Sequence, residues 1–527
     1  MIHATLRTSL FALCSLGATV LSEQAVAVTL PQTLQLHGES YDYPLGPDSQ
    51  RQDGVPMGTV TEHELLKSSV YPGTVRRYSV YVPAQYDAKV PAALMVFQDG
   101  HAYASGQFRV PVVFDNLIHS GEMPPTIAVF VDPGHVSDEL PEKRGWQPKP
   151  KNRSTEYDTL SPAYAQFLSS DLLPLIEASY SISPDPALRA ISGLSSGGIC
   201  AFTAAWERPD LFGKVLSHIG SFTNIRGGDA YPGIIRKTEK KPIRVYLQDG
   251  STDLDNEHGS WWLGNLSLDA ALRYKEYDVK FDQGTGGHGG EHGAAVLPGA
   301  LRWLWRDAPG VTPKLALVPE PRGDAWWIQR HEAKLAARRA MGAVDLLMVG
   351  DSITHSWENG GRAVWDRYYA GRRAFNIGFS GDRTEHVIWR LQNGAAHGLS
   401  PKLAVLMIGT NNTGHRMEKA DHTAAGIRRV VAEMRVRMPK TKVLVLGIFP
   451  RGEQPDHRQR RLNDEINSKI QSLGEQEMVT YLDISSVFLD DEGVLSKALM
   501  PDLLHPNEKG YALWAEAMEE TIERLMK

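Results

Sequence analysis

The chain alternates short apolar runs with helix-length amphipathic segments, and it does so twice, on either side of one proline-rich stretch. Short apolar runs between turn residues are typical of buried strands, and the amphipathic segments between them are long enough for helices. This alternation predicts an α/β fold class with mostly parallel sheets. A chain of 527 residues has the length of two domains, each able to bury its own core.

The proline-rich stretch divides the predicted elements into two sets. In the first set we expect strands at 76–83, 92–98, 126–132, 214–220 and 243–248, and helices at 163–180 and 295–307. In the second set we expect a helix at 326–339 and strands at 344–350, 374–378, 403–409, 442–449 and 479–484. Residues 308–324 hold four prolines and two glycines, which predicts a linker. The predicted domains are therefore 28–307 and 325–527.

The first 27 residues have the pattern of a signal peptide. Arg7 supplies a positive charge, residues 9–21 form a short apolar core, and Ala25 and Ala27 make a small-x-small cleavage site. A buried N-terminal helix is the alternative. We expect export to a secreted or periplasmic location, and no later run is apolar for the ~18 residues of a membrane span. Cleavage would leave Cys200 as the single cysteine, so no disulfide can form within the chain.

A second feature is the sequence Gly-Asp-Ser that follows the run at 344–350. Ser352 would lie between a strand and a helix, where open α/β sheets bind ligands and helix N–H groups favour anions. Asp-Ser is also ordinary helix-capping chemistry. However, "NIGFSGD" (376–382) and "GTNN" (409–412) end the next two strands with polar groups. Asp502 and His505 lie three residues apart, close enough for the carboxylate to orient the imidazole.

These blocks, in this order, resemble the SGNH/GDSL hydrolases, most of all the platelet-activating-factor acetylhydrolase catalytic-subunit type, over residues 319–527. The resemblance implies a flavodoxin-like fold with Ser352 as nucleophile, His505 as base and Asp502 as the residue that fixes the imidazole tautomer. It also implies an oxyanion hole made by the N–H groups of Ser352 and Gly381 and the amide of Asn411. Ser380 stands where this type usually has glycine, which affects the expected shape of the pocket.

The first half carries a second candidate nucleophile. "GLSSG" (193–197) fits Gly-x-Ser-x-Gly with Ser195 at its centre, and the glycines suit a crowded strand-to-helix turn. Such a serine needs an acid and then a histidine later in the chain. Asp253 follows a predicted strand and is the expected acid, with Asp255 as the alternative. His288 is the expected base, with His292 as the alternative.

The loop around these histidines also permits a metal interpretation. "HGGEH" (288–292) matches a zinc-peptidase pattern that requires both histidines on one helix face. The many glycines of this loop would each cost such a helix up to ~1 kcal/mol relative to alanine. We therefore expect a serine triad that uses no metal and no other cofactor.

"GLSSGG", "QDG", the "GGH" loop and the closing "RWLWRD" resemble the esterase family that includes enterochelin esterase and carbohydrate feruloyl and acetyl-xylan esterases, over residues 59–307. The resemblance implies an α/β-hydrolase fold. It implies oxyanion donors at the N–H of Ser196 and at Gly100 or His101. Trp261 and Trp262 lie near the expected acid, and they are either a stacking surface for a sugar or aromatic ring or two core residues.

The combined prediction is an exported tandem serine esterase that hydrolyses acetyl and feruloyl esters on decorated polysaccharides. Its expected partner is an acylated carbohydrate or another small ester. The net charge is −6 without a basic stripe, so we do not expect nucleic-acid binding. Alternatives are a siderophore-ester hydrolase in the first domain, a lipid acetyl-ester hydrolase in the second, or one domain acting only as a carbohydrate-binding module. The oligomeric state is left open.

Overall fold

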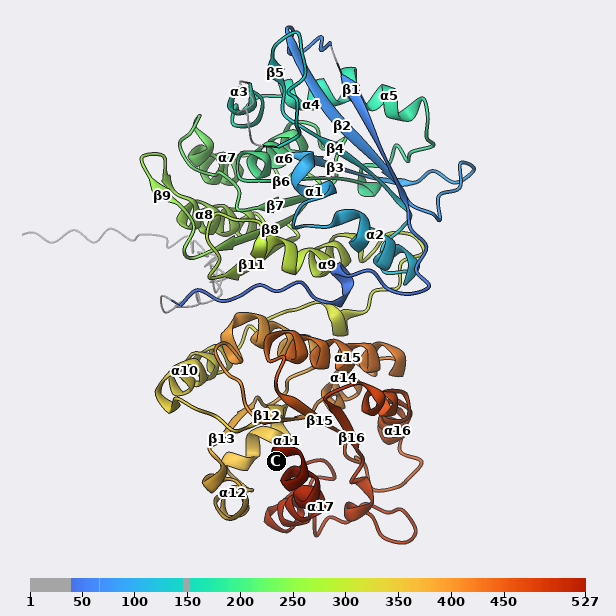
Figure 1. The fold of residues 1–527 in the computed structure, drawn as a ribbon, viewed down its shortest axis with the longest axis vertical. Coiled ribbons are helices and arrows are strands. Elements are labelled where there is room, and N and C mark those ends of the chain that lie inside the picture. The colour runs from blue at the N-terminus through green and yellow to red at the C-terminus, as the bar shows by residue number, and fades with distance from the viewer. Residues whose placement is uncertain (1–38, 66, 146–151) are drawn as a thin grey trace, which may run out of the picture.

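The computed structural model describes residues 39–65, 67–145 and 152–527. Two α/β units lie one above the other, and each has a central sheet with helices on both faces (Figure 1). This confirms the predicted fold class of an α/β-hydrolase fold followed by a flavodoxin-like fold. The predicted signal peptide, 1–27, lies outside the described residues. Within the described residues, no helix has the length and apolar character needed to cross a bilayer.

The first sheet has the strand order β1-β2-β4-β3-β6-β7-β8-β11, and β5 (His135–Val136) pairs with β2. Its strands are β1 (Thr59–Leu65), β2 (Thr74–Val82), β3 (Ala93–Gln98), β4 (Thr126–Val131), β6 (Arg189–Leu194), β7 (Lys214–His218), β8 (Arg244–Gly250) and β11 (Val279–Gly284). All five strands expected in this half are present. The pairs β1–β2 and β2–β4 are antiparallel, whereas the strands from β4 to β11 pair in parallel. The sequence did not predict β1, because its side chains are mostly exposed and it has no apolar run.

Helices on both faces of the first sheet enclose two apolar cores. The helices are α1 (Gly100–Ala104), α2 (Val110–His119), α3 (Arg153–Tyr157), α4 (Ala163–Phe167), α5 (Leu173–Glu177), α6 (Ser196–Glu207), α7 (Tyr231–Lys237), α8 (Trp261–Tyr274) and α9 (Glu291–Trp305). The helix predicted at 163–180 is wrong as a single helix. A π-helical turn at Leu168–Leu172 separates α4 from α5, and Pro174, which has no N–H to donate, lies in the first turn of α5.

The second sheet is entirely parallel, with the order β13-β12-β14-β15-β16. Its strands are β12 (Leu346–Gly350), β13 (Ala374–Gly378), β14 (Leu403–Met407), β15 (Lys442–Leu446) and β16 (Val479–Leu482). Its helices are α10 (Ala325–Met341), α11 (Ser352–His355), α12 (Arg362–Tyr368), α13 (Thr384–Arg390), α14 (Thr410–Arg416), α15 (Ala420–Arg437), α16 (Arg458–Ile470) and α17 (Glu508–Met526). Two apolar clusters, one on each face, form its core. All five predicted strands are confirmed, and some end earlier than expected.

The predicted linker is packed between the two units. Ala316 is fully buried in a short 3₁₀ turn, and its carbonyl accepts a hydrogen bond from Oγ1 of Thr384 in the second unit. Nζ of Lys280 in β11 donates to the carbonyl of Pro319 at 2.7 Å. Residues 308–324 are therefore a fixed connection, and the domain boundaries stay a prediction.

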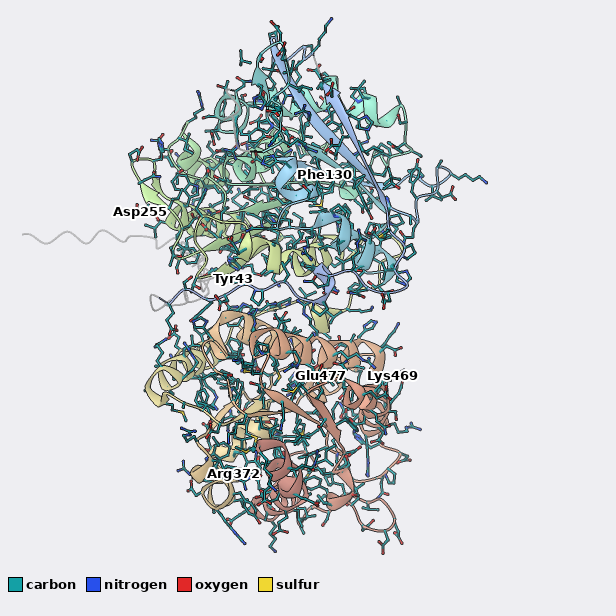
Figure 2. All side chains as sticks on the ribbon, in the orientation of Figure 1. Tyr43, Phe130, Asp255, Arg372, Lys469 and Glu477 are labelled. Atoms are coloured by element: carbon teal, nitrogen blue, oxygen red, sulfur yellow. The ribbon has the colours of Figure 1, made fainter. Side chains whose placement is uncertain are left out.

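A second segment also lies between the units. Residues 39–50, which we call the strap, run along the boundary between the two sheets and their helices (Figure 1). Tyr43 of the strap lies in this boundary layer, in contrast to Asp255, which lies at the outer edge of the first unit (Figure 2). The strap therefore contacts both units, as described below.

Candidate active sites

Ser195 occupies a strained turn at the end of β6. Its backbone has φ 57° and ψ −122°, a conformation that non-glycine residues rarely adopt, and α6 begins at the next residue. A Cβ at Gly193 would lie 2.2 Å from the carbonyl oxygen of Gly197, so this turn closes only around glycine. The turn thus lifts the Ser195 side chain at the carboxyl end of the sheet, as a nucleophile elbow requires.

Ser195, His288 and Asp253 form one hydrogen-bonded chain. Oγ of Ser195 lies 2.8 Å from Nε2 of His288, and Nδ1 of His288 lies 2.6 Å from Oδ1 of Asp253. The Asp253 side chain is fully buried, whereas the His288 side chain is 23% exposed. The imidazole can therefore reach a substrate while the carboxylate holds it from behind.

The structure separates the alternatives that the sequence left open. Asp255 lies in a short exposed hairpin strand, β9 (Asp255–Asn256), whereas the hydrogen bond of His288 is accepted by Asp253. His292 lies inside α9, where it is buried, stacks on Tyr43 and has Nδ1 2.8 Å from Nε2 of Gln248. Because His288 precedes α9 and His292 is part of it, the two histidines do not share a helix face as the zinc pattern requires.

Sequence reasoning missed a second buried carboxyl group behind the triad. Asp249, at the end of β8, is fully buried, and Nδ2 of Asn265 donates to it at 2.8 Å. Burial, and then the neighbouring Asp253 carboxylate, raise the pKa of Asp249 well above its ordinary value. The raised pKa favours the neutral form of Asp249. The sequence signal was present, since Asp249 directly follows the predicted strand.

A cavity of about 530 Å³ opens beside Ser195. Phe108, His101, Arg153 and Leu194 line it together with Ser195 and His288. Two bonds of Arg153 to the buried carboxylate of Asp99 fix its guanidinium, Nε to Oδ1 at 2.9 Å and Nη2 to Oδ2 at 2.7 Å. The cavity thus brings apolar side chains and a charged group together beside the serine.

The hydrogen bonds of the backbone show which of the predicted oxyanion donors of the first site are available to a ligand. Ser196 is the first residue of α6, so its N–H has no acceptor within the helix and is available to a ligand. The N–H of His101 donates to Oδ1 of Asp132 at 2.9 Å, which removes His101 as a donor. Gly100 remains the candidate. A Cβ there would lie 2.3 Å from the backbone of Phe130, so only glycine fits.

The prediction that Trp261 and Trp262 offer a stacking surface needs correction. Trp261 is 3% exposed, its Nε1–H donates to Oγ of Ser221 at 3.0 Å, and its ring meets the His288 imidazole edge-on at 5.6 Å. Trp262 packs against Phe281 of the core. Neither ring lines the cavity beside Ser195. Trp261 supports His288 from behind.

Ser352 is the first residue of α11, directly after β12. Oδ1 of Asp351 accepts the N–H of Ile353 at 3.0 Å and so caps the helix, while the Ser352 side chain remains partly exposed. No described residue donates to the second carboxylate oxygen of Asp351. Burial raises the pKa of Asp351 to about 7. Asp351 therefore caps the helix, and the neighbouring Ser352 occupies the position of the nucleophile.

His505 and Asp502 complete the second chain of hydrogen bonds. Nε2 of His505 lies 2.9 Å from Oγ of Ser352, and Nδ1 lies 2.6 Å from Oδ2 of Asp502. The three-residue spacing brings them together in a turn in which Leu503 has φ 60°. Burial alone would raise the pKa of Asp502, but hydrogen bonds from the backbone and ring of His505 hold it below its ordinary value.

The predicted oxyanion groups of the second site lie on the loops after β13 and β14. Gly381 has φ 77°, which turns the backbone as only glycine readily does. Nδ2 of Asn411 donates to the carbonyl of Asp382 at 2.9 Å, which fixes the amide plane. Oγ of Ser380 lies 2.9 Å from Nδ1 of His355. Sequence reasoning missed Arg322 of the linker, whose Nη1 donates to the carbonyl of Ser380 at 2.9 Å and so supports this loop.

Both arrangements are those of serine hydrolases built on α/β sheets. Residues 348–513 match the GDSL-like lipase/acylhydrolase family, and residues 69–224 match the family described as "Putative esterase". The chain is 33% identical over 207 residues to platelet-activating factor acetylhydrolase IB subunit alpha2 of Rattus norvegicus, covering 39% of this chain and 87% of that protein. It is 31% identical over 213 residues to subunit alpha1 of Homo sapiens, covering 40% and 88%.

The chain therefore belongs to the GDSL-like lipase/acylhydrolase family through its C-terminal half. It is an ester-hydrolysing enzyme with two hydrolase domains.

Two solved structures are similar to the first domain. The enterobactin esterase of Shigella flexneri is 23% identical with a TM-score of 0.40, covering 50% of this chain and 63% of that chain, a little under two thirds of its length. A ferulic acid esterase of Anaeromyces mucronatus is 20% identical with a TM-score of 0.38, covering 49% of this chain and 93% of that chain.

Proposed function

We propose that Ser195 and Ser352 are the nucleophiles of two separate carboxylic-ester hydrolase sites in one exported chain. The observation that carries the proposal is the pair of complete serine–histidine–aspartate hydrogen-bond chains, one in each domain. Each of these two hydrogen-bonded triads is made of residues from a single domain. Each site therefore has its own nucleophile, base and acid.

Each site would use the same sequence of steps. The serine Oγ attacks the ester carbonyl while the histidine Nε2 takes its proton, and the histidine then gives that proton to the departing alcohol. Water then attacks the acyl-serine while the histidine takes a proton from it. The histidine returns that proton to the serine Oγ, and the carboxylic acid is released. Asp253 and Asp502 keep the proton of their histidine on Nδ1, so that Nε2 is free to accept. The oxyanion would bind to Ser196 and Gly100 in the first site, and to Ser352, Gly381 and Asn411 in the second.

The substrate we propose is a polysaccharide that carries acetyl and feruloyl esters. The second domain is related to proteins named as acetylhydrolases, which supports an acetyl ester at Ser352. The cavity beside Ser195 has about 530 Å³, a size that leaves room for a ring-bearing acyl group because ligand pockets span about 300–1,000 Å³. Two deacylating sites on one exported chain would remove two kinds of ester from the same polymer.

A substrate panel tests this proposal. The purified chain is offered acetylated and feruloylated xylan, methyl ferulate, an acetyl glycerol-ether lipid and a catecholate trilactone, and released acids are quantified. We expect acetate and ferulate from the polymers, with no loss of activity in a chelator. Hydrolysis confined to the lipid, or to the trilactone, would replace the polysaccharide by that substrate. If one domain released nothing from any ester but the chain still bound the polymer, that domain would be a binding module.

A further inference from the structure

The loop that carries His288 has little stiffness of its own. Residues 284, 286, 287, 289 and 290 are all glycine, and glycine has the greatest backbone freedom of any residue. Nevertheless, His288 must lie within hydrogen-bond distance of both Ser195 and Asp253. Contacts from outside the loop must therefore fix its position.

The strap supplies such contacts at Thr285, three residues before His288. The N–H of Thr285 donates to Oη of Tyr43 at 2.7 Å, and the N–H of Tyr41 donates to Oγ1 of Thr285 at 2.8 Å. Thr285 is fully buried. A buried N–H that loses its acceptor destabilises the folded chain, so the Tyr43 hydroxyl is a strong constraint on this loop.

Thr285 also joins the histidine loop to the acid loop. Oγ1 of Thr252, the residue next to Asp253, donates to the carbonyl of Thr285 at 2.8 Å. The Tyr43 ring stacks on the imidazole of His292 at 4.1 Å and 21°. A Cβ at Gly284 would lie 2.3 Å from Oη of Tyr43, so the loop rests directly on this side chain.

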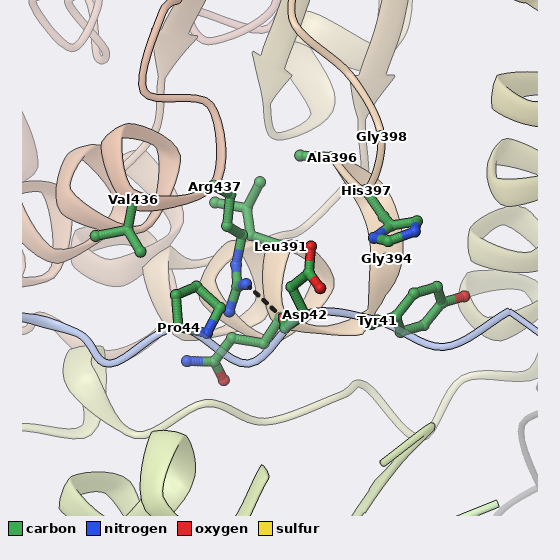
Figure 3. A pocket seen from close by; sticks show the side chains of 11 residues that line it. Tyr41, Asp42, Pro44, Leu391, Gly394, Ala396, His397, Gly398, Val436 and Arg437 are labelled. Carbon is green, nitrogen blue, oxygen red and sulfur yellow. Dashed lines mark hydrogen bonds between the residues drawn. The ribbon is translucent and has the colours of Figure 1, made fainter. Parts of the chain in front are cut away.

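The other side of the strap is held by the second domain. Asp48 forms ion pairs with Arg302 of α9 in the first domain and with Arg429 of α15 in the second. Burial alone would raise the pKa of Asp48, but the two guanidinium groups hold it well below its ordinary value. Nη1 of Arg437, also in α15, donates to the carbonyl of Asp42 at 3.2 Å (Figure 3).

We propose that Tyr43 is a positioning residue of the first active site, which holds the His288 loop through Thr285, and that the second domain keeps Tyr43 in place through the strap. This inference rests on the proposed role of His288. The second domain would then support the geometry of the first site through the strap, without contacting the substrate of that site.

The test uses the full chain with Ser352→Ala as the parent, so that ester hydrolysis reports Ser195 alone. Tyr43→Phe removes the hydroxyl and keeps the ring on His292. We expect kcat to fall about 10-fold, the cost of roughly one lost buried hydrogen bond, with KM unchanged because Tyr43 does not line the cavity. Amide hydrogen exchange over 284–293 should become faster. Tyr43→Ala should lose more activity than Tyr43→Phe.

The matched control is Tyr41→Phe, because the Tyr41 hydroxyl has no hydrogen-bond partner among the described residues and its loss should leave kcat unchanged. The contribution of the second domain is tested by Arg429→Met against Arg435→Met. Arg435 lies on the same helix, and within the described part of the chain its guanidinium donates to carbonyls just beyond the end of that helix. We expect Arg429→Met alone to lower kcat at Ser195. In a Ser195→Ala background, Tyr43→Phe should leave the second site fully active, which shows that the fold is intact.

Unchanged kcat and unchanged exchange over 284–293 in Tyr43→Phe would overturn the positioning role. Equal behaviour of Arg429→Met and Arg435→Met would overturn the support from the second domain. A parent that hydrolyses no ester would contradict the proposed function of the first site, and the exchange measurement would then test the Tyr43 contact alone.

Discussion

Replacing Ser352 by alanine should stop acetate release by the second domain while ferulate release by the first domain continues at the rate of the unaltered chain. Alanine keeps the start of α11 and the Asp351 cap but removes the attacking oxygen, and loss of a triad nucleophile costs on the order of a million-fold in turnover. Loss of the Ser352 hydroxyl should not affect the first site, because that site has its own serine, histidine and acid. Acetate from a small acetyl ester and ferulate from methyl ferulate are measured on the same preparation.

Ser195→Ala is the reciprocal control, with ferulate release lost and acetate release kept. If Ser352→Ala left acetate release intact and Ser195→Ala removed it, the assignment of the acyl groups to the two domains would be reversed. If Ser195→Ala changed no rate on any ester, the first domain would not be a catalyst for those esters.

Asp253→Asn should lower kcat of the first site by about 10,000-fold in a Ser352→Ala background. The carboxylate accepts from Nδ1 of His288 at 2.6 Å, and an asparagine amide that turns its NH₂ toward the ring favours the wrong tautomer. The Asn side chain has nearly the same size, so the buried position should stay filled. The measurement is kcat for methyl ferulate, with the thermal midpoint of the variant as a check on folding.

Asp255→Asn is the matched control, because Asp255 lies two residues away in the exposed hairpin and should leave kcat unchanged. Loss of activity in Asp255→Asn but not in Asp253→Asn would contradict the assignment of the acid. Full activity of both single variants, lost when Asp249→Asn is added to Asp253→Asn, would transfer the role to the carboxyl group behind the triad.

The alternation of apolar runs was sufficient to predict most of the fold. Some of the expected strands, such as the run at 403–409, are apolar along their whole length, as a strand buried on both faces requires. β1 could not be found this way, since its exposed side chains leave only backbone pairing with β2 to define it. Pro174 indicates a break between α4 and α5, but the amphipathic pattern continues across this proline and so predicted one helix.

The residues of the two sites differed in how far sequence could place them. Asp502 and His505 are close in the chain, so their pairing follows from local geometry. Asp253 and Asp255 share one loop, and only the folded chain buries one and exposes the other. Tyr43 lies 242 residues from Thr285, and no local pattern links a tyrosine to a distant backbone N–H. The same limit applied to Arg322, which supports the second site from the linker.

The central claim is that one chain holds two independent serine nucleophiles, and covalent titration tests it most directly. The chain is treated with a small fluorophosphonate, which phosphonylates activated serines, and intact mass is measured for the unaltered chain, Ser195→Ala, Ser352→Ala and the double variant. We expect two adducts on the unaltered chain, one on each single variant, and none on the double variant, with the modified peptides containing Ser195 and Ser352. A single adduct on the unaltered chain, or an adduct that persists on the double variant, would contradict the claim.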